Sequence, residues 1–366
     1  MKIIFACRAN IFIVPGGDTV QLLRLKEHLA PRGVEAAIAP EPDAIRPGAA
    51  DIVHVFNIFD TDSACAHAAA ARAAQIPLVI TPNYWDPMEF FFQTSPSLFH
   101  RLVRRLLPEA TAFRWYAANK RRKLLPERVR QREVLAAAAR ILPNSAAEAG
   151  HLARDFALND SSRFSVVYNA VDYEAAAAAS AEWFAGRYGI KDFVLAVGRF
   201  EERKNQLGIV RELAAFPAPL VFIGGVPPYQ RPYFEACRRA AAGRRDILFI
   251  EGLSQREVFS AMHAARVHVL ASWWENTGLV SLEAAACGCR IVTTDRSPHQ
   301  EYFGDSAHLC DPARPGSIAA AVARAWQAPP PAGLAAEIKT KFTWPNAAAA
   351  LEKIYAEVLE AGASRK

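Results

Sequence analysis

Short apolar runs alternate with longer helical patterns along almost the whole sequence, and this alternation restricts the fold more than any other feature. The runs are rich in Val, Ile, Leu and Phe and are bounded by turn residues, which is typical of strands buried on both faces. Such strands, separated by helices, indicate doubly wound α/β sheets of parallel strands. The predicted strands are Lys2–Ala6, Ala36–Ala39, Ile52–Phe56, Leu78–Thr81, Arg140–Pro143 and Phe164–Val167, followed by Phe193–Val197, Leu220–Ile223, Ile247–Ile250, Val267–Ala271 and Arg290–Thr294.

These strands fall into two successive series, joined by an alanine-rich segment at 175–185. A chain of 366 residues is too long for one hydrophobic core, so we expect two Rossmann-like domains. Their predicted bounds are 1–172 and 173–343. The terminal segment 344–366 is expected to hold a last helix with one apolar face.

The sequence also limits where the protein is expected to work. No apolar run approaches the roughly 20 residues that a membrane span requires, and the first residues have the pattern of a buried strand rather than of a signal peptide. The six cysteines form no CxxC pair, so we expect free thiols, mostly in the core, in a cytoplasmic protein. No His/Cys/Asp cluster has the spacing of a metal site, and no metal requirement is expected.

Basic residues are concentrated between Arg101 and Arg132, opposed there only by Glu109 and Glu127. They are Arg101, Arg104, Arg105, Arg114, Lys120, Arg121, Arg122, Lys123, Arg128, Arg130 and Arg132. Apolar residues are interleaved at helical spacing, which is typical of a segment that binds an anionic membrane surface or a phosphorylated acceptor. The alternative is a solvated helix pair whose arginines bridge to neighbouring acids. No nucleic-acid-binding module accompanies the segment, so nucleic acid is not an expected partner.

Two cations follow the strand Phe193–Val197. Gly198 permits a tight exit from that strand, and Arg199 and Lys204 come directly after it. Ligands of open α/β sheets bind beyond the carboxyl ends of the strands. An arginine fork and a lysine point charge at such an edge are suited to a diphosphate. Surface cations near a helix start are the alternative.

Two glutamates flank a predicted helix start after the strand Val267–Ala271. Glu275 precedes the helix, Gly278 stands at its start and Glu283 lies inside it. A glycine there lets an anion approach free backbone N–H groups, which the helix dipole favours. Two carboxylates on either side can accept hydrogen bonds from sugar and ribose hydroxyls. By spacing alone, an ordinary helix with unrelated acids explains the pair as well.

The pattern Ser-x-x-Glu-x-x-Gly-Leu-x-x-x-Glu-Ala from Ser272 to Ala284 resembles the E-x7-E signature of retaining glycosyltransferases of the GT-B fold, family 4. The resemblance covers nearly the whole chain. Its other landmarks are Gly16-Gly17, Asp51–Val55, Leu142–Ser145, Val167–Asp172, Val197–Phe200, Gly288–Val292 and Phe342–Trp344. It implies a GT-B architecture, with two Rossmann-like domains facing across a cleft, the first binding the acceptor and the second the nucleotide-sugar donor. It also implies that the segment 344–366 packs back on the first domain.

The resemblance also implies roles for individual residues. Arg199 and Lys204 would bind the donor diphosphate and offset the charge of the leaving group, and Glu275 would contact the donor sugar. These three are the expected catalytic residues. The other expected donor-binding residues are Gly17, Gly252, Leu253, Thr277, Gly278, Leu279 and Glu283, of which Glu283 would hold the ribose and the loop at Gly252-Leu253 the base.

The implied reaction transfers a sugar from a UDP- or GDP-sugar with retention of anomeric configuration and without a protein nucleophile. Attack and departure would occur on one face, with the leaving phosphate accepting the acceptor's proton, so positioning and electrostatic stabilisation would dominate. The basic segment suggests a glycan or polyprenyl-linked acceptor in cell-surface polysaccharide synthesis, with the enzyme peripheral on the inner face of the membrane.

One position departs from the family pattern, and two other features invite a functional reading that we do not adopt. Many members carry a histidine near Asn83, and an amide cannot take up a proton. The segment Asn83, Tyr84, Trp85 and Asp86 is therefore assigned to the acceptor site, with core packing as the alternative for its two aromatic residues. His54 is expected to be a hydrogen-bonded core histidine. The Asp60-Thr61-Asp62 motif imitates a metal-binding DxD sequence and is expected to be a loop.

Other reactions are compatible with the same architecture, because fold does not determine function. Nucleotide-sugar epimerases and sugar phosphorylases share it, and a non-catalytic member would bind a nucleotide sugar or a membrane only. Isomer formation without an acceptor would favour an epimerase, and measurable donor hydrolysis would exclude a non-catalytic member.

Overall fold

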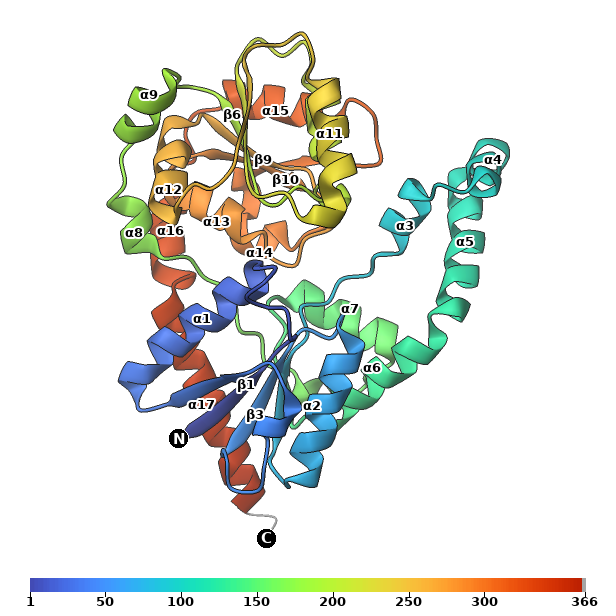
Figure 1. Ribbon diagram of the computed structural model, residues 1–366, viewed down its shortest axis with the longest axis vertical. Coiled ribbons are helices and arrows are strands. Elements are labelled where there is room, and N and C mark those ends of the chain that lie inside the picture. Colours follow the sequence, from blue (N-terminus) through green and yellow to red (C-terminus); the bar gives the residue numbers. More distant parts are fainter. Residues whose placement is uncertain (364–366) are drawn as a thin grey trace. The chain divides into compact units, whose positions relative to one another are not determined.

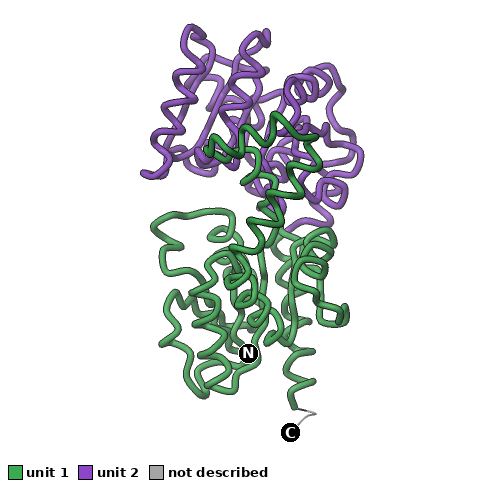
Figure 2. Tube along the Cα trace, turned by 90° about the vertical axis from the view of Figure 1, so that its right-hand side faces the viewer, with its two compact units in different colours: residues 1–169, 344–366 green, residues 170–343 purple. Residues whose placement is uncertain are grey.

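The protein consists of two compact units in a computed structural model that describes residues 1–363 (Figure 2). The first unit contains Met1–Asn169 together with the C-terminal segment from Trp344, and the second contains Ala170–Thr343. Each unit has its own parallel sheet and its own hydrophobic core. The α/β class with two doubly wound sheets is thus confirmed.

The first unit is built on a five-stranded sheet in the order β2-β1-β3-β4-β5, and every pairing is parallel (Figure 1). The strands are β1 (Lys2–Ala6), β2 (Glu35–Ala39), β3 (Ile52–Phe56), β4 (Leu78–Thr81) and β5 (Arg140–Ile141). Every residue of β3 and β4 is buried, as the continuous apolar runs predicted. The predicted strand Phe164–Val167 is wrong, since this segment makes only an isolated bridge between Phe164 and Ile141.

Helices connect these strands. They are α1 (Gly17–Leu29), α2 (Thr61–Ala73), α3 (Met88–Thr94), α4 (Leu98–Leu106), α5 (Glu109–Lys123), α6 (Leu125–Ala137) and α7 (Ala146–Phe156), with short 3-10 turns at Ala30–Arg32, Pro42–Ala44 and Ser161–Arg163. Asp60 caps α2 by accepting a hydrogen bond from Ser63 N, so Asp60-Thr61-Asp62 forms a helix start, and the predicted loop there is wrong.

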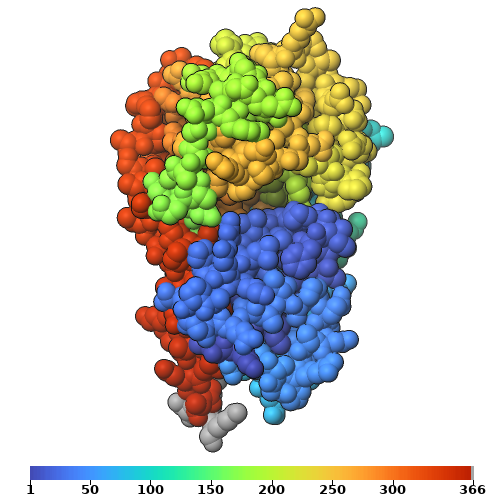
Figure 3. Space-filling model, turned by 60° about the vertical axis from the view of Figure 1, so that its left-hand side comes forward, coloured from blue at the N-terminus to red at the C-terminus, as the bar shows by residue number. Residues whose placement is uncertain are grey.

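The last helix, α17 (Trp344–Ala363), belongs to the first unit and packs against α1. Figure 3 shows the C-terminal segment in red alongside the N-terminal segment in blue. The α17 side chain of Tyr355 is fully buried and places its hydroxyl 2.6 Å from Nδ1 of His54 in β3. The chain therefore returns to complete the first unit after it has formed the second.

The second unit is built on a six-stranded parallel sheet in the order β11-β10-β9-β6-β7-β8. The strands are β6 (Val194–Val197), β7 (Leu220–Ile223), β8 (Ile247–Ile250), β9 (Val267–Leu270), β10 (Arg290–Thr294) and β11 (Ala307–Cys310). The edge strand β11 was not predicted, because its sequence Ala-His-Leu-Cys is half-buried and lacks the continuous apolar run of the others.

Helices cover this sheet too. They are α8 (Tyr173–Ala177), α9 (Glu182–Tyr188), α10 (Gln206–Glu212), α11 (Arg231–Ala240), α12 (Gln255–Ala264), α13 (Leu279–Ala286), α14 (His299–Phe303), α15 (Ser317–Gln327) and α16 (Leu334–Lys341), with 3-10 turns at Glu202–Lys204, Pro228–Gln230 and Gly304–Ser306. The six cysteines are free, and five of them are buried, as predicted. No helix among residues 1–363 is long and apolar enough to cross a membrane.

Candidate functional site

The candidate donor site lies at the carboxyl ends of β6 and β9, which are neighbours in the second sheet. The loop after β6 carries Arg199 and Lys204, and the loop after β9 carries Glu275. A backbone hydrogen bond of 2.8 Å from Trp273 N to Arg203 O joins the two loops. Residues 71 positions apart in sequence are thereby brought into contact.

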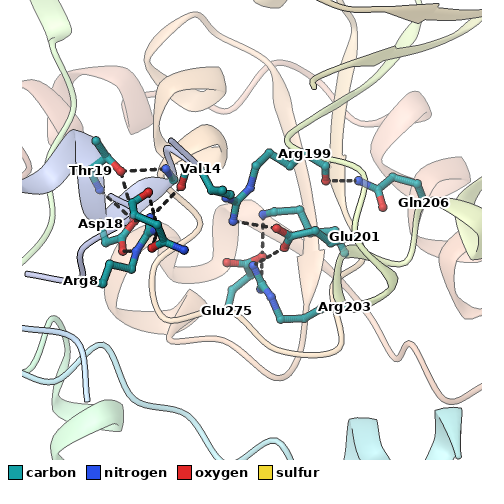
Figure 4. Close-up of polar contacts among 12 residues, drawn as sticks. Arg8, Val14, Asp18, Thr19, Arg199, Glu201, Arg203, Gln206 and Glu275 are labelled. Carbon is teal, nitrogen blue, oxygen red and sulfur yellow. Dashed lines mark hydrogen bonds and ion pairs between the residues drawn. The ribbon is translucent and has the colours of Figure 1, made fainter. Parts of the chain in front are cut away.

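Glu275 is the centre of a buried ion cluster, drawn in Figure 4. Its Oε1 atom accepts hydrogen bonds from Lys204 Nζ at 3.1 Å, Arg203 Nη1 at 3.0 Å and Ser272 Oγ at 2.7 Å. The side chain of Glu275 is only 10% exposed. Arg203 Nη1 also donates to the carbonyl oxygen of Trp274, which fixes the guanidinium beside the loop.

A second carboxylate, Glu201, links the remaining cation to this cluster. Arg199 Nη2 lies 2.7 Å from Glu201 Oε1, and Arg203 Nη2 lies 3.6 Å from Glu201 Oε2. Three cations thus face two carboxylates, so the cluster has an excess of one positive charge. A positive excess at the carboxyl ends of the strands is suited to an anionic ligand.

The charged groups of this cluster shift one another's pKa values. Burial raises the pKa of the Glu275 carboxyl, but the nearby Lys204 and Arg203 outweigh burial and bring that pKa to about 2. Burial lowers the pKa of Lys204, whereas Glu275 raises it. His268 in β9 is buried with a pKa of about 3, because burial and then Lys204 disfavour its charged form. Glu275 is therefore ionised and His268 neutral near neutral pH.

Two glycines give this site its shape. Gly198 has φ of +140°, and a Cβ there would lie 3.1 Å from Cδ of Lys204, so glycine leaves space for the lysine side chain. Gly278 caps α13 in the left-handed region with φ of +69°, and a Cβ there would meet Leu270 at 3.0 Å. Thr277 just before it is buried and lies 3.4 Å from the hydroxyl of Tyr302. The helix begins at Leu279, one residue after the predicted start at Gly278.

Glu283 lies apart from the ion cluster, on α13. Its Oε1 accepts a hydrogen bond of 2.9 Å from Gln255 at the start of α12. Ser254 and Glu257 form a capping box there, which fixes the preceding turn that contains Gly252 and Leu253. The two glutamates of the motif thus contact different segments. Glu275 contacts the loop after β6, and Glu283 contacts the helix that follows β8.

In the first unit, the loop after β1 is held by Arg8 (Figure 4). Arg8 donates to both carboxylate oxygens of Asp18, at 2.8 and 3.1 Å, and to Val14 O at 2.8 Å. Gly16 N donates to Thr19 Oγ1 at 2.9 Å, and Gly17 begins α1. The predicted glycine loop is thus an ordered helix start, and the role of Gly17 toward a donor stays a prediction.

The predicted acceptor segment follows β4. Asn83 has φ of +53° and accepts a hydrogen bond from Asn144 Nδ2 at 2.7 Å, and Asp86 is paired with Arg121 at 2.8 Å. Tyr84 and Trp85 are buried, 3% and 7% exposed, so the packing alternative accounts for both rings. The acceptor role of all four residues stays a prediction.

Two other predictions concern the first unit. His54 is a hydrogen-bonded core histidine, as predicted, since Thr81 Oγ1 lies 2.9 Å from Nε2 and Tyr355 satisfies the other nitrogen. Burial lowers its pKa to about 3. In the part of the chain that the structure describes, no group of three or more His, Cys, Asp or Glu side chains is arranged to hold a metal ion.

The basic segment 101–132 covers three helices, α4 to α6. The alternative of bridged arginines accounts for part of it, because Arg121 pairs with Asp86, Arg128 with Asp155 and Arg130 with Asp62. Arg104 donates to the carbonyl oxygens of Phe92 and Gln93. The remaining arginines are exposed.

Several site residues were missed from the sequence. Arg203, Glu201 and Ser272 complete the ion cluster, and Glu148 is a fully buried carboxylate that accepts from Tyr84 N and Asn144 N, each at 2.7 Å. Ser272 and Glu148 had a local signal, as the first residue of Ser-x-x-Glu and as the last of Ser145-x-x-Glu148. Arg203 had none beyond its place next to Lys204.

Comparisons with known proteins match both units. The family model described as glycosyl transferases group 1 matches residues 182–340, and the model described as glycosyltransferase family 4 matches residues 42–175. Sucrose-phosphate synthase from Thermosynechococcus elongatus superposes with a TM-score of 0.75 over 99% of this chain and 100% of that chain, at 15% identity. The chain belongs to the group 1 glycosyltransferases of the GT-B fold. This glycosyltransferase also shares its fold with Anabaena HepE, solved in complex with UDP-glucose, at a TM-score of 0.69 and 16% identity over 99% of this chain and 100% of that one.

Curated relatives of this glycosyltransferase match over part of its length. A Campylobacter jejuni N-acetylgalactosamine-N,N'-diacetylbacillosaminyl-diphospho-undecaprenol 4-alpha-N-acetylgalactosaminyltransferase is 28% identical over 167 residues, 45% of this chain and 44% of that protein. A Mycobacterium tuberculosis glycogen synthase is 29% identical over 173 residues, 44% of this chain and 42% of that protein. The chain spans less than half the length of the curated relatives that it matches.

Proposed function

We propose that this glycosyltransferase moves a sugar from a UDP- or GDP-sugar to a glycan or polyprenyl-linked acceptor, with retention of anomeric configuration and without a metal. Arg199 and Lys204 bind the diphosphate, and Glu275 accepts hydrogen bonds from the donor sugar. The backbone of Thr277, Gly278 and Leu279 binds the distal phosphate, and Glu283 binds the ribose. The loop at Gly252-Leu253 meets the base, and Gly17 approaches the donor or acceptor.

The ion cluster around Glu275 is the observation that carries this proposal. Arg199 and Lys204 supply cations in the loop after β6, Arg203 beside them pairs with Glu275 from the neighbouring strand β9, and the cluster has a positive excess. The start of α13 follows Glu275 in the loop after β9. Cations and a helix N-terminus together are suited to a diphosphate, whose charge increases as the glycosidic bond breaks.

The chemistry of Glu275 supports transfer without a protein nucleophile. A carboxylate with a pKa of about 2 is a weak base and a weak nucleophile at neutral pH. Its Oε1 already accepts from three donors, which holds the carboxylate in place and leaves Oε2 to accept hydrogen bonds from sugar hydroxyls. We infer that the acceptor's proton passes to the leaving phosphate and that attack occurs on the face the phosphate leaves, which retains the configuration.

The acceptor proposal places the enzyme in cell-surface polysaccharide synthesis. The name of the Campylobacter relative specifies a diphospho-undecaprenol acceptor. We infer a cytoplasmic enzyme that works at the inner face of the membrane, where a polyprenyl-linked acceptor is available. The segment 101–132 supplies positive charge for that contact.

Donor binding tests the proposal directly. Thermal unfolding is measured with a panel of UDP- and GDP-sugars and with the free nucleotides, each with EDTA present. A donor at about a hundred times its Kd raises the unfolding temperature by roughly 5 to 10 °C, because it binds only the folded state. If no nucleotide sugar stabilises the protein, the donor assignment is wrong.

The product distinguishes the reaction. With the donor identified, turnover with candidate acceptors is followed by proton NMR of the transferred anomeric centre. The proposal expects the donor's anomeric configuration in the product and activity that survives EDTA. An inverted product contradicts retention, and an isomerised nucleotide sugar formed without acceptor identifies an epimerase.

A further inference from the structure

The helix α4 presents a leucine stripe to solvent. Leu98, Leu102 and Leu106 follow one another at four-residue spacing and are 75%, 52% and 70% exposed. Phe99, at the side of this stripe, is 58% exposed. A surface helix of a globular protein ordinarily turns such a stripe toward the core, so this arrangement is the reverse of the usual one.

The opposite face of α4 is fixed by contacts within the first unit. His100 Nδ1 lies 2.7 Å from Ser95 Oγ, and its ring packs edge-on to Tyr116 with centroids 4.9 Å apart. Val103 packs on a small aromatic cluster of α3 and α5, formed by Phe92, Ala112 and Tyr116 and separate from the core beneath the sheet. The face of α4 that carries His100 and Val103 therefore packs on the protein, and the face that carries the leucines points to solvent.

Positive charge accompanies the exposed leucines. Arg101 and Arg105 are exposed on α4, and Arg114 is exposed on α5. In residues 1–363, neither Arg101 nor Arg105 has a salt bridge within 4.0 Å, and no acidic residue occurs between Leu98 and Pro108. Trp115, 40% exposed, packs edge-on against Phe99 with centroids 5.6 Å apart. In Figure 1, α4 lies at the end of α5 that is farther from the sheet of the first unit.

We propose that the α4 stripe, defined as Leu98, Phe99, Leu102 and Leu106 with Arg101, Arg105 and Trp115, docks on an anionic lipid surface. The leucines enter the boundary between headgroups and acyl chains, as in an interfacial amphipathic helix. The arginines bind lipid phosphates, and the two aromatic rings lie at headgroup level. This goes beyond simple charge attraction of the whole segment 101–132, because several of its arginines are bound to the protein.

Charge selects a lipid surface over a second copy of the chain. A two-fold symmetric contact through the stripe places the same patch on both sides, so it brings the arginines of one copy toward those of the other. An anionic bilayer instead supplies negative charge next to an apolar layer. The inference deepens the proposed function and rests on it only for its purpose, which is to bring the acceptor site to a lipid-linked substrate.

Vesicle flotation of the full chain tests the proposal. The vesicles contain phosphatidylcholine alone or with roughly 30% phosphatidylglycerol, which supplies a negative surface for the arginines. The wild type is expected to float with anionic vesicles and not with neutral ones. Leu102→Gln with Leu106→Gln is expected to weaken binding at least roughly tenfold, since two leucines lose their apolar contact. Arg101→Gln with Arg105→Gln is expected to weaken it about thirtyfold.

The matched control is Arg238→Gln with Arg239→Gln on α11, which removes the same charge from exposed positions of the second unit. This variant is expected to bind as the wild type does. Far-UV circular dichroism and thermal unfolding confirm that each variant folds. If the control loses as much binding as the α4 variants, or if the leucine variant floats normally, the stripe is not the docking element.

Two further readouts separate the possible outcomes. If the wild type stays in solution with anionic vesicles at low salt while sedimentation shows a dimer that the leucine variant lacks, a second copy covers the stripe and the proposal is wrong. Donor-induced thermal stabilisation without vesicles is expected to be unchanged in the α4 variants. Loss of vesicle binding with normal donor binding therefore supports the stripe, whereas absence of donor binding in every form contradicts the proposed function alone.

Discussion

At the scale of single residues, two cations share one carboxylate. Lys204 and Arg203 both donate to Oε1 of Glu275, at 3.1 and 3.0 Å. If Lys204 turns toward a donor diphosphate, Arg203 remains to balance the charge of Glu275, because its guanidinium is fixed by the carbonyl of Trp274. We therefore assign Arg203 as a positioning residue that holds Glu275 in place for the donor sugar.

The first prediction concerns the two cations that are proposed to bind the diphosphate. Arg199→Ala and Lys204→Ala are each expected to lower kcat by about 10²- to 10³-fold, roughly 3 to 4 kcal/mol, because each removes fixed positive charge that opposes the charge of the leaving group. Steady-state kinetics with the identified donor measures this. Near-normal turnover in both variants would contradict the assignment.

Arg203 gives the second prediction. Arg203→Ala is expected to weaken nucleotide-sugar binding about tenfold while free nucleotide binds nearly as in the wild type, since only the sugar depends on the position of Glu275. Arg203→Lys is expected to restore part of this difference. The two affinities are measured by calorimetry, with Arg238→Ala as the control for charge. Equal losses for nucleotide and nucleotide sugar would show that Arg203 acts on the diphosphate or on folding instead.

Residues with a local signal were predictable, and those defined by tertiary contacts were not. Arg199, Lys204 and Glu275 directly follow strands that their apolar runs identify. Because the carboxyl ends of parallel strands lie on one side of a sheet, their proximity could be inferred. Arg203 forms its ion pair across 72 positions, and no spacing rule specifies such a partner. The burial of Tyr84 and Trp85 likewise depends on helices from elsewhere in the first unit.

At the scale of elements, strongly apolar strands and glycine-bounded helices were predictable. The continuous runs of β3, β4 and β7 are fully buried, as their sequences indicated. One predicted strand was wrong, and one strand was missed. Phe164–Val167 has a strand-like composition but makes only one bridge, and the half-buried edge strand β11 has no apolar run. An edge strand has one neighbour and needs fewer apolar residues.

The helix α13 allows a controlled prediction because it has a left-handed glycine at each end. Gly278→Ala and Gly288→Ala are each expected to destabilise the protein by about 1 to 2 kcal/mol, since φ is +69° and +85°. Only Gly278→Ala is expected to weaken donor binding, by at least roughly tenfold, because its new methyl group would meet Leu270 at 3.0 Å and so shift the backbone N–H groups of the proposed phosphate site. Gly288 has nothing within 4 Å of the added Cβ and serves as the matched control.

Denaturant unfolding and donor-dependent thermal shifts measure the two effects separately. Equal donor binding by both variants would mean that the start of α13 does not contact the donor. Loss of donor binding in Gly288→Ala as well would indicate a general effect on the helix rather than a local one.

At the scale of the whole molecule, the chain closes its first unit with its last helix. The hydroxyl of Tyr355 from α17 bonds to His54 at the centre of the first sheet, and both side chains are completely buried. The apolar face of this helix was visible in the sequence. Its partner on the sheet was implied only by family resemblance, since contacts 301 positions apart leave no local pattern. Because His54 is completely buried beside Tyr355, the packing of α17 on the first sheet depends on a neutral histidine.

The last prediction is therefore a loss of stability in mild acid. Burial lowers the pKa of His54 from 6.5 to about 3, so between these values the unfolded chain binds a proton that the folded chain excludes. Stability from this group is full above about pH 6.5 and decreases as pH falls toward 3, by up to about 1.4 kcal/mol per pH unit. Near pH 5 the expected loss from His54 is about 2 kcal/mol.

Hydrogen exchange of β3 and α17, compared near pH 7.5 and pH 5 after correction for intrinsic rates, measures this loss of stability within the first unit. His54→Gln, which cannot titrate, is expected to remove this pH dependence while it lowers stability at both values. If the variant keeps the full acid sensitivity, His54 is not its source, and α17 is held by other contacts.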